Sequence, residues 1–199
     1  MQLSRGAISA AALSILDEYG LADVSMRRVA SSLGVAPGAL YWHIENKQEL
    51  ISDLAALIIA PLVDAPPPAP DIACARLRAA LLRHRDGAEV VITAVSQPDS
   101  PVARRLARLI REAVAGSGDT AAGGASTRDA HAAADGLLYL TLGAAYVHQS
   151  AEQLAQATGG TEVARPRDAG ADVDRAVELL LAGMRVAPEQ ISDTINPHD

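Results

Sequence analysis

The chain has 199 residues, 49% of them hydrophobic, and a formal net charge of −7. That content is enough for one compact domain, or for a small domain beside a larger one. A single cysteine, Cys74, excludes an internal disulfide, no apolar run is long enough to span a bilayer, and the start lacks a signal core, so we expect a cytoplasmic protein without a membrane span.

The first two predicted helices are marked by their capping residues. Residues 5 to 19 place apolar side chains on one helical face, and Gly20 follows where a left-handed C-cap would lie. Ser25 can cap a second helix, which Gly34 ends. The inward side chains of this second helix are expected to be Met26, Val29, Ala30 and Leu33.

Two further helices are expected before a proline-rich joint. Residues 36 to 43 predict a short third helix with a proline in its first turn. Asn46 and Glu49 resemble a capping box that starts a fourth helix. We expect Pro61 and the APPPAP run at 65 to 70 to end that helix and to mark a joint between domains. The inward side chains of the fourth helix are predicted to be Leu50, Leu54, Leu57 and Ile58.

The remainder of the chain also has the pattern of helices. A break at Asp86-Gly87 separates the first two of them, and flexible segments are expected at 116 to 126 and 157 to 170. No run alternates as a β-strand does, so the sequence predicts an all-α protein. The expected helices span 72 to 85, 88 to 95, 102 to 114, 128 to 154 and 172 to 187.

The acidic net charge argues against nucleic-acid binding, but one short segment reverses it locally. Between Met26 and Lys47 the only acidic residue is Glu45, whereas Arg27 and Arg28 both carry positive charge. An acidic protein with such a patch would engage DNA only through one small surface, because the rest of the molecule repels phosphates.

Three segments resemble a known family. Residues 25 to 50, SMRRVASSLGVAPGALYWHIENKQEL, are similar to the helix-turn-helix signature of TetR-type regulators. Residues 81 to 88, LLRHRDGA, and 140 to 143, LTLG, resemble segments of the tetracycline-repressor branch. The resemblance implies an all-α homodimer with an N-terminal three-helix DNA-binding domain and a helical C-terminal ligand-binding and dimerisation domain. The corresponding bounds are 1–46 for the DNA-binding domain, 47–65 for a connecting helix and 66–199 for the ligand-binding and dimerisation domain.

The second helix of a helix-turn-helix enters the major groove of DNA with its N-terminal residues. Arg27 can contact a guanine edge, and Lys47 can contact a phosphate. Trp42 is expected to lie at DNA, and the alternative is that it is a core aromatic of a small domain. The start of this helix departs from the family pattern, because its side chains offer only apolar contact. The operator is therefore expected to differ from that of the tetracycline branch. The residues that the resemblance places at DNA are Met26, Arg27, Ala36, Pro37, Gly38, Ala39, Tyr41, Trp42, His43 and Lys47.

The resemblance also places four apolar side chains where the tetracycline branch uses polar drug contacts and a metal-holding histidine. They are Ala73, Leu77, Val91 and Ala94. None of them can ligate a metal or donate a hydrogen bond, which argues against magnesium-tetracycline and for an apolar or aromatic effector with no metal or cofactor. Polar groups that could orient such an effector, or could instead lie at the dimer interface or surface, are His131, Tyr139, Tyr146, His148 and Gln149.

Two helices are expected to build the dimer. Those at 128 to 154 and 172 to 187 are predicted to form a four-helix interface across a two-fold axis, so that two readers address a palindrome. Ligand bound under the break at Asp86-Gly87 is expected to shift the next helix, swing the fourth helix and alter the spacing of the readers. Small residues that permit close approach are Gly136, Gly143, Ala144 and Ala145.

Enzyme motifs are not found in the sequence. It has no G-x-S-x-G elbow, no glycine-rich phosphate loop, and no Glu-x-x-His for a di-iron bundle, so we do not expect an enzyme. His84, beside Arg85 and Asp86 at a helix end, is expected to have a structural or interdomain role. The expected function is a ligand-responsive repressor. The alternative is a helical ligand-binding or interaction protein that has lost DNA reading, favoured by the acidic charge and the bare helix start.

Overall fold

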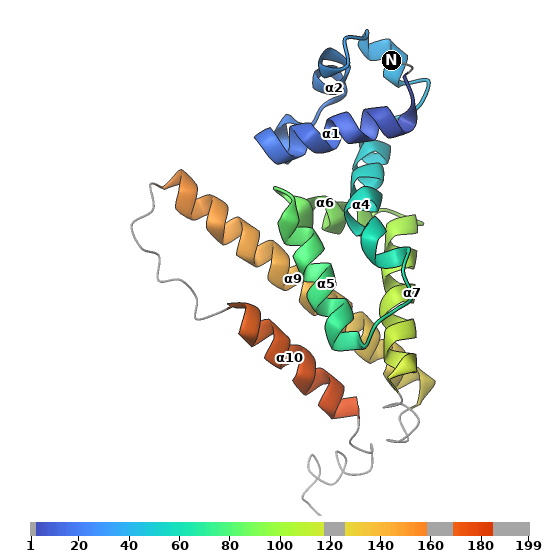
Figure 1. Cartoon of the computed structure of the whole chain (residues 1–199), viewed down its shortest axis with the longest axis vertical. Helices are drawn as coiled ribbons and strands as arrows, with labels where there is room; N and C mark the ends of the chain where they lie inside the picture. The colour runs from blue at the N-terminus through green and yellow to red at the C-terminus, as the bar shows by residue number, and fades with distance from the viewer. Residues whose placement is uncertain (1–2, 118–125, 159–168, 185–199) are drawn as a thin grey trace, which may run out of the picture.

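The computed structural model describes residues 3–117, 126–158 and 169–184, and all regular secondary structure in this part of the chain is helical. The all-α prediction is therefore confirmed. Figure 1 shows α1 and α2 at one end of an elongated molecule, with α4 leading from them into a body of longer helices. The helices are α1 (Arg5–Tyr19), η1 (Leu21–Asp23), α2 (Met26–Ser32), α3 (Pro37–Leu40), α4 (Lys47–Val63), α5 (Pro70–Arg83), α6 (Gly87–Val95), α7 (Pro101–Gly116), α9 (Thr127–Ala157) and α10 (Ala169–Met184).

Helix α1 and helix α2 begin at the residues whose side chains cap them. Ser4 accepts a hydrogen bond from the Ala7 amide, and Ser25 accepts one from the Arg28 amide, which confirms the predicted second N-cap. Gly20 ends α1 with φ 91° and ψ 173°, a conformation that favours glycine but is not the left-handed helical cap expected. Met26, Val29 and Ala30 are buried as predicted, and Leu33 is partly buried.

Helix α3 is shorter than the predicted 36–43. It ends at Leu40 because the Leu40 carbonyl accepts hydrogen bonds from both the His43 and the Ile44 amides, 2.9 Å each, which turns the chain tightly. Residues Tyr41 to His43 therefore form a non-helical turn and not a second turn of the helix. This turn presents its three side chains outward, between buried residues on either side.

Helix α4 begins after Asn46 as predicted, but the partner of Glu49 and the C-terminal end of the helix differ from the prediction. Asn46 caps it by accepting the Glu49 amide, but the Glu49 carboxylate accepts the Glu45 amide at 2.6 Å instead of the Asn46 amide, so the capping box is shifted by one residue. Pro61 does not end the helix, which continues to Val63. A proline this close to a C-terminus removes few helical hydrogen bonds, and the Asp64 amide still closes the last turn on Ala60.

The inward face of α4 is close to the predicted one. Leu50, Leu54 and Ile58 are buried, whereas Leu57 is 42% exposed and faces away from the core. Helix α4 packs against α6 and also touches α1, α5 and α7, so it joins the N-terminal helices to the body of the molecule. This position makes α4 the covalent connection between the body and the first three helices.

The predicted break at Asp86-Gly87 is confirmed. Helix α5 ends at Arg83 and α6 starts at Gly87, with Asp86 in a left-handed conformation at φ 56°. A Cβ atom at Gly87 would lie 2.3 Å from the Leu81 carbonyl oxygen, so a glycine is needed for this close approach of the two helices. We call residues His84, Arg85 and Asp86 the α5–α6 turn.

Helices α5, α7 and α10 all pack against the long helix α9, as Figure 1 shows for α5 and α10. The predicted helix at 128–154 extends three residues further in α9, and the predicted flexible segments 116–126 and 157–170 lie largely outside the described residues. Among the described helices, none is both long and apolar enough to cross a membrane.

Candidate nucleic-acid interface and effector core

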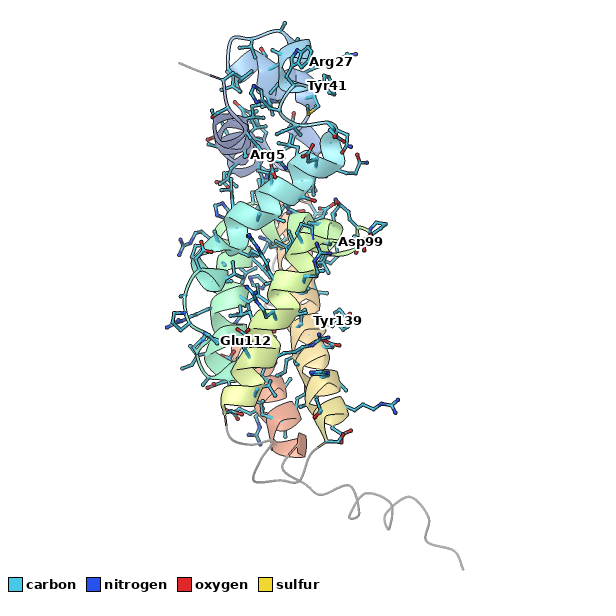
Figure 2. The ribbon with its side chains drawn as sticks, turned by 90° about the vertical axis from the view of Figure 1, so that its right-hand side faces the viewer. Arg5, Arg27, Tyr41, Asp99, Glu112 and Tyr139 are labelled. Atoms are coloured by element: carbon cyan, nitrogen blue, oxygen red, sulfur yellow. The ribbon has the colours of Figure 1, made fainter. Side chains whose placement is uncertain are left out.

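An exposed cluster of side chains surrounds α3 at one end of the molecule. Trp42 is 89% exposed and Tyr41 is 54% exposed, so the interpretation of Trp42 as a core aromatic is wrong. Figure 2 shows Arg27 and Tyr41 at this end of the molecule, and α10 lies toward the opposite end. We call this cluster the α3 surface, and its members are Arg27, Tyr41, Trp42, His43 and Lys47, all of which are exposed.

The α3 surface is held in place from beneath by the core. Leu40 and Ile44, which flank the three exposed residues of the turn, have no exposed side-chain area. Met26, predicted to contact DNA, is only 8% exposed and packs in this core. The cluster is therefore presented by a rigid support rather than by a free loop.

The start of α3 is exposed but chemically bare. Ala36, Pro37 and Gly38 are exposed, Ala39 is partly buried, and no side chain caps the helix. These residues can contribute only backbone groups and small apolar contacts. Hydrogen bonds from side chains must therefore come from neighbouring parts of the α3 surface.

Arg28 does not belong to the α3 surface, although the sequence counts it in the positive segment. It pairs with Asp23 and lies over the Tyr19 ring, 3.9 Å from the ring centroid. A hydrogen bond with Glu18 raises the pKa of Tyr19, so this ring keeps its proton. Asp23 lies outside the segment from Met26 to Lys47, which is why local charge counting missed the neutralisation.

Arg5 ties α1 to α4 directly below this surface. Its guanidinium donates to both carboxylate oxygens of Asp53 at 2.7 Å each, and it also pairs with Glu49 at 2.6 Å. The Asp53 hydrogen bond raises the pKa of Arg5, and the hydrogen bond from the Glu45 amide lowers the pKa of Glu49. The N-terminal end of α1 is therefore fixed to α4 by charge-assisted hydrogen bonds.

The four apolar residues predicted to line the effector site lie on α5 and α6. Ala73, Leu77, Val91 and Ala94 are all at most 1% exposed. Beside them in the core is Cys74, whose pKa is raised by burial. This interior is almost entirely apolar. Within the described residues, no three histidine, cysteine, aspartate or glutamate side chains are grouped so that they could hold a metal ion.

The five polar residues predicted beside that core do not converge on it. His131, Tyr139 and Tyr146 are exposed, and His148 is partly buried and pairs with Glu152. Figure 2 places Tyr139 on the side of the molecule, well away from Arg27 and Tyr41. Only Gln149 is buried among the five, and its side chain already bonds the backbone around the α5–α6 turn.

The α5–α6 turn contacts the C-terminal end of α1, which agrees with the structural or interdomain role expected for His84. The His84 Nδ1 lies 3.0 and 3.1 Å from the two Asp17 carboxylate oxygens, and Arg85 donates to the Glu18 carbonyl at 3.1 Å. Asp86 accepts the Leu21 amide at 2.6 Å. Three consecutive residues thus hold the end of the first helix.

The other end of α6 is joined to α4 through a residue that the sequence did not single out. Gln97 accepts a hydrogen bond from the Ser52 hydroxyl at 2.8 Å and donates one to the Gln48 carbonyl at 3.2 Å. Because both partners lie more than 40 residues away, no local pattern could have identified Gln97. Each end of α6 therefore contacts an element that supports the α3 surface.

Comparisons with known proteins agree with this arrangement. Residues 8–54 match the family model described as bacterial regulatory proteins, tetR family. The chain is 33% identical over 169 residues to the class A tetracycline repressor protein from transposon 1721 of Escherichia coli, covering 80% of this chain and 74% of that protein. The match to the Escherichia coli class D tetracycline repressor, 37% identical over 97 residues, spans less than half of that protein, 44%.

Solved structures extend the similarity over the whole fold. The crystal structure of Mycobacterium smegmatis BioQ is 36% identical to this chain and has a TM-score of 0.75. The match covers 92% of this chain and 98% of that chain. BioQ in complex with its double-stranded DNA operator is 34% identical with a TM-score of 0.72, covering 92% of this chain and 99% of that one. The similarity therefore includes both the N-terminal helices and the helical body.

Proposed function

Because the chain belongs to the TetR family of bacterial regulatory proteins, we propose that it is a cytoplasmic DNA-binding transcriptional regulator, namely a repressor that leaves a palindromic operator when a small apolar or aromatic effector binds. In this proposal residues 1–46 read DNA, 47–65 connect, and 66–199 bind effector and dimerise. The BioQ complex with its operator supports DNA binding, and the tetracycline repressors support repression.

The α3 surface is the observation that carries this proposal. Its side chains combine two cations, two aromatic rings and an imidazole on a rigid, exposed platform next to a helix start. Arg27 has the fork of donors that fits a guanine edge, whereas Lys47 in the first turn of α4 suits a phosphate. Because Arg28 is paired with Asp23, we assign direct base reading to Arg27.

The test compares two exposed arginines. Genomic fragments bound by the full chain are selected, and the affinity of the tightest fragment is then measured for Arg27→Ala and for Arg76→Ala on α5. We expect R27A to weaken binding by about 10- to 150-fold, as for the loss of a bidentate base contact, and R76A to leave it unchanged. Equal binding by the two variants would contradict base reading by Arg27, and the absence of any bound fragment at low salt would contradict DNA reading.

The exposed side of α9 supports a homodimer. Tyr139, Tyr146, Val147 and Leu154 are spaced at i, i+7, i+8 and i+15, so they share one exposed face, with Gly143 between them. Helix α10 packs against α9 and exposes Leu179 and Leu180. Such a contiguous apolar face is typical of a surface covered by a partner. Ala145, by contrast, is buried within its own chain and cannot serve the interface as predicted.

The apolar core between α5 and α6 supports the proposed class of effector. Ala73, Leu77, Val91 and Ala94 can surround a hydrocarbon or aromatic group but cannot bind it through side-chain hydrogen bonds. Their helices end at the α5–α6 turn on one side and at Gln97 on the other. A ligand that separates α5 from α6 would therefore act on contacts that reach α1 and α4.

A further inference from the structure

The α5–α6 turn is held from a second side by two glutamines of α9. The Gln149 Oε1 accepts the Ala88 amide at 2.9 Å, and its Nε2 donates to the Leu81 carbonyl at 3.2 Å and to the His84 carbonyl at 2.8 Å. One helical turn later, the Gln153 Nε2 donates to Asp86 Oδ1. Figure 1 shows α9 and the α1 end on either side of the start of α6.

One carboxylate therefore connects α9 to the N-terminal helices. Asp86 uses Oδ1 for Gln153 of α9 and Oδ2 for the Leu21 amide of η1, directly after α1. Its left-handed backbone and the close approach of Gly87 to the Leu81 carbonyl fix where this carboxylate lies. We call the chain of contacts Gln153, Asp86 and Leu21 the α9–η1 link.

We propose that the α9–η1 link sets the orientation of the α3 surface relative to the dimer, and so determines which half-site spacing the protein accepts. The inference rests on the proposed function. Helix α4 is the only covalent connection between the first three helices and the body, and on its own it leaves the far end of α1 free to tilt relative to the body. A second contact at the far end of α1 removes that freedom, while Arg5 fixes the near end to α4.

The position of Gln153 on α9 makes this link relevant to the dimer. Its neighbour Leu154, with Tyr146 and Val147, belongs to the apolar face proposed to meet the second subunit. The subunit contact fixes the position of α9, Gln153 of α9 fixes Asp86, and Asp86 fixes η1. Since the two readers of such a dimer must match half-sites a fixed number of base pairs apart, a rotation at η1 changes the preferred spacing. Gln153 and Asp86 are thus positioning residues and do not themselves touch DNA.

Three variants of the full chain test the link. Gln153→Glu places a second carboxylate against Asp86 and removes the donor. The double variant Asp86→Asn with Gln153→Glu restores a donor and acceptor pair, since the introduced amide can accept from Leu21 and donate to the introduced carboxylate, and asparagine tolerates a positive φ. Gln156→Glu is the matched control, because it adds the same charge at an exposed position of α9.

The first measurement is amide hydrogen exchange at Leu21, without DNA. We expect Q153E to speed exchange by at least about tenfold, the double variant to return it toward the wild-type rate, and Q156E to leave it unchanged. Wild-type exchange in Q153E would overturn the link. A double variant as fast as Q153E would do the same, because it would mean that the effect comes from the added charge and not from the contact.

The second measurement is binding to the selected operator and to versions with one or two base pairs inserted between or deleted from the half-sites. We expect the wild type and Q156E to discriminate between spacings by at least about tenfold, Q153E to lose most of that discrimination, and the double variant to regain it. Q153E with faster exchange but unchanged discrimination would overturn the positioning role. A wild type that binds no fragment would refute the proposed function and the role in spacing together, while exchange at Leu21 would still decide on the link.

Discussion

The side chains around α3 owe their exposure to the residues beside them. Tyr41, Trp42 and His43 are held outward because Leu40 and Ile44 are fully buried and because two amides converge on the Leu40 carbonyl. Tyrosine and tryptophan are enriched at binding surfaces. At the scale of single residues, exposure of this kind separates the α3 surface from Met26 and Arg28, which the sequence alone grouped with it.

Gly87 gives a prediction at the same scale. Substitution by alanine would place a Cβ 2.3 Å from the Leu81 carbonyl oxygen, a backbone atom that cannot move without shifting α5. We expect Gly87→Ala to lower the free energy of unfolding by about 1–3 kcal/mol, measured by chemical denaturation. The control Gly116→Ala, where no neighbouring side chain or loop atom of the described residues lies within 4 Å, should be neutral or stabilising by up to about 1 kcal/mol. A G87A protein as stable as the wild type would contradict the close approach.

The start of α4 gives a prediction at the scale of one element. The Glu45 amide lowers the pKa of Glu49 below its ordinary 4.5, so Glu49 favours the folded state above that pH, and this contribution is lost as pH falls through the lowered value. In Glu49→Gln the carboxylate is gone, and we expect the decline in Tm between about pH 5 and pH 3 to be shallower than in the wild type.

A capping variant separates charge from helix capping at this position. Asn46→Ala removes the cap but keeps Glu49, and it should lower stability by about 1 kcal/mol at every pH. An E49Q protein whose Tm falls with pH as steeply as that of the wild type would mean that Glu49 does not contribute to the acid sensitivity. Thermal scans monitored by circular dichroism make both comparisons.

The apolar interior between α5 and α6 gives a second prediction for an element. If effector enters beside Ala73, then Ala73→Leu fills the space, keeps operator binding and abolishes release by an effector first identified in a thermal-shift screen of apolar and aromatic compounds. Ala79→Leu, on the exposed side of α5, should respond normally. A73L that is destabilised by about 1–3 kcal/mol would instead identify Ala73 as tightly packed core.

At the scale of the whole molecule, α9 combines two roles on adjoining parts of its surface. Gln149 and Gln153 hold the α5–α6 turn, and beside Gln153 lie the exposed apolar residues proposed to meet a second subunit. A rigid helix with both roles would transmit subunit geometry to the N-terminal helices through Asp86 and η1. Effector, dimer and DNA contacts would then be coupled through free-energy differences between alternative positions of α6.

The dimer is tested by placing a charge on that apolar face. We expect Val147→Asp to shift the protein toward monomer in sedimentation velocity and to weaken operator binding, because a buried unpaired carboxylate opposes association. Leu57→Asp, on an exposed position of α4 outside the proposed interface, should leave the oligomeric state unchanged. Equal sedimentation of the two variants would argue against α9 as the interface.

Much of this protein is determined by local sequence. Serines and an asparagine that cap helices, a glycine after α1, and apolar periodicity set most helix bounds to within a few residues, because these signals act between residues at most four apart. The helix-turn-helix pattern at residues 25–50 likewise identified the family, since its turn and aromatic run are contiguous in the chain.

Only the tertiary structure decided which side chains remain free to act. Arg28 is held by Asp23, the five polar effector candidates do not converge, and Asp86 bonds Leu21 and Gln153, each more than 60 residues away along the chain. Contacts at such separation depend on how the helices pack together, and helical periodicity specifies which face is apolar but not which polar groups meet. Sequence therefore determined the helices and the family, and packing decided how α1, α6 and α9 are joined.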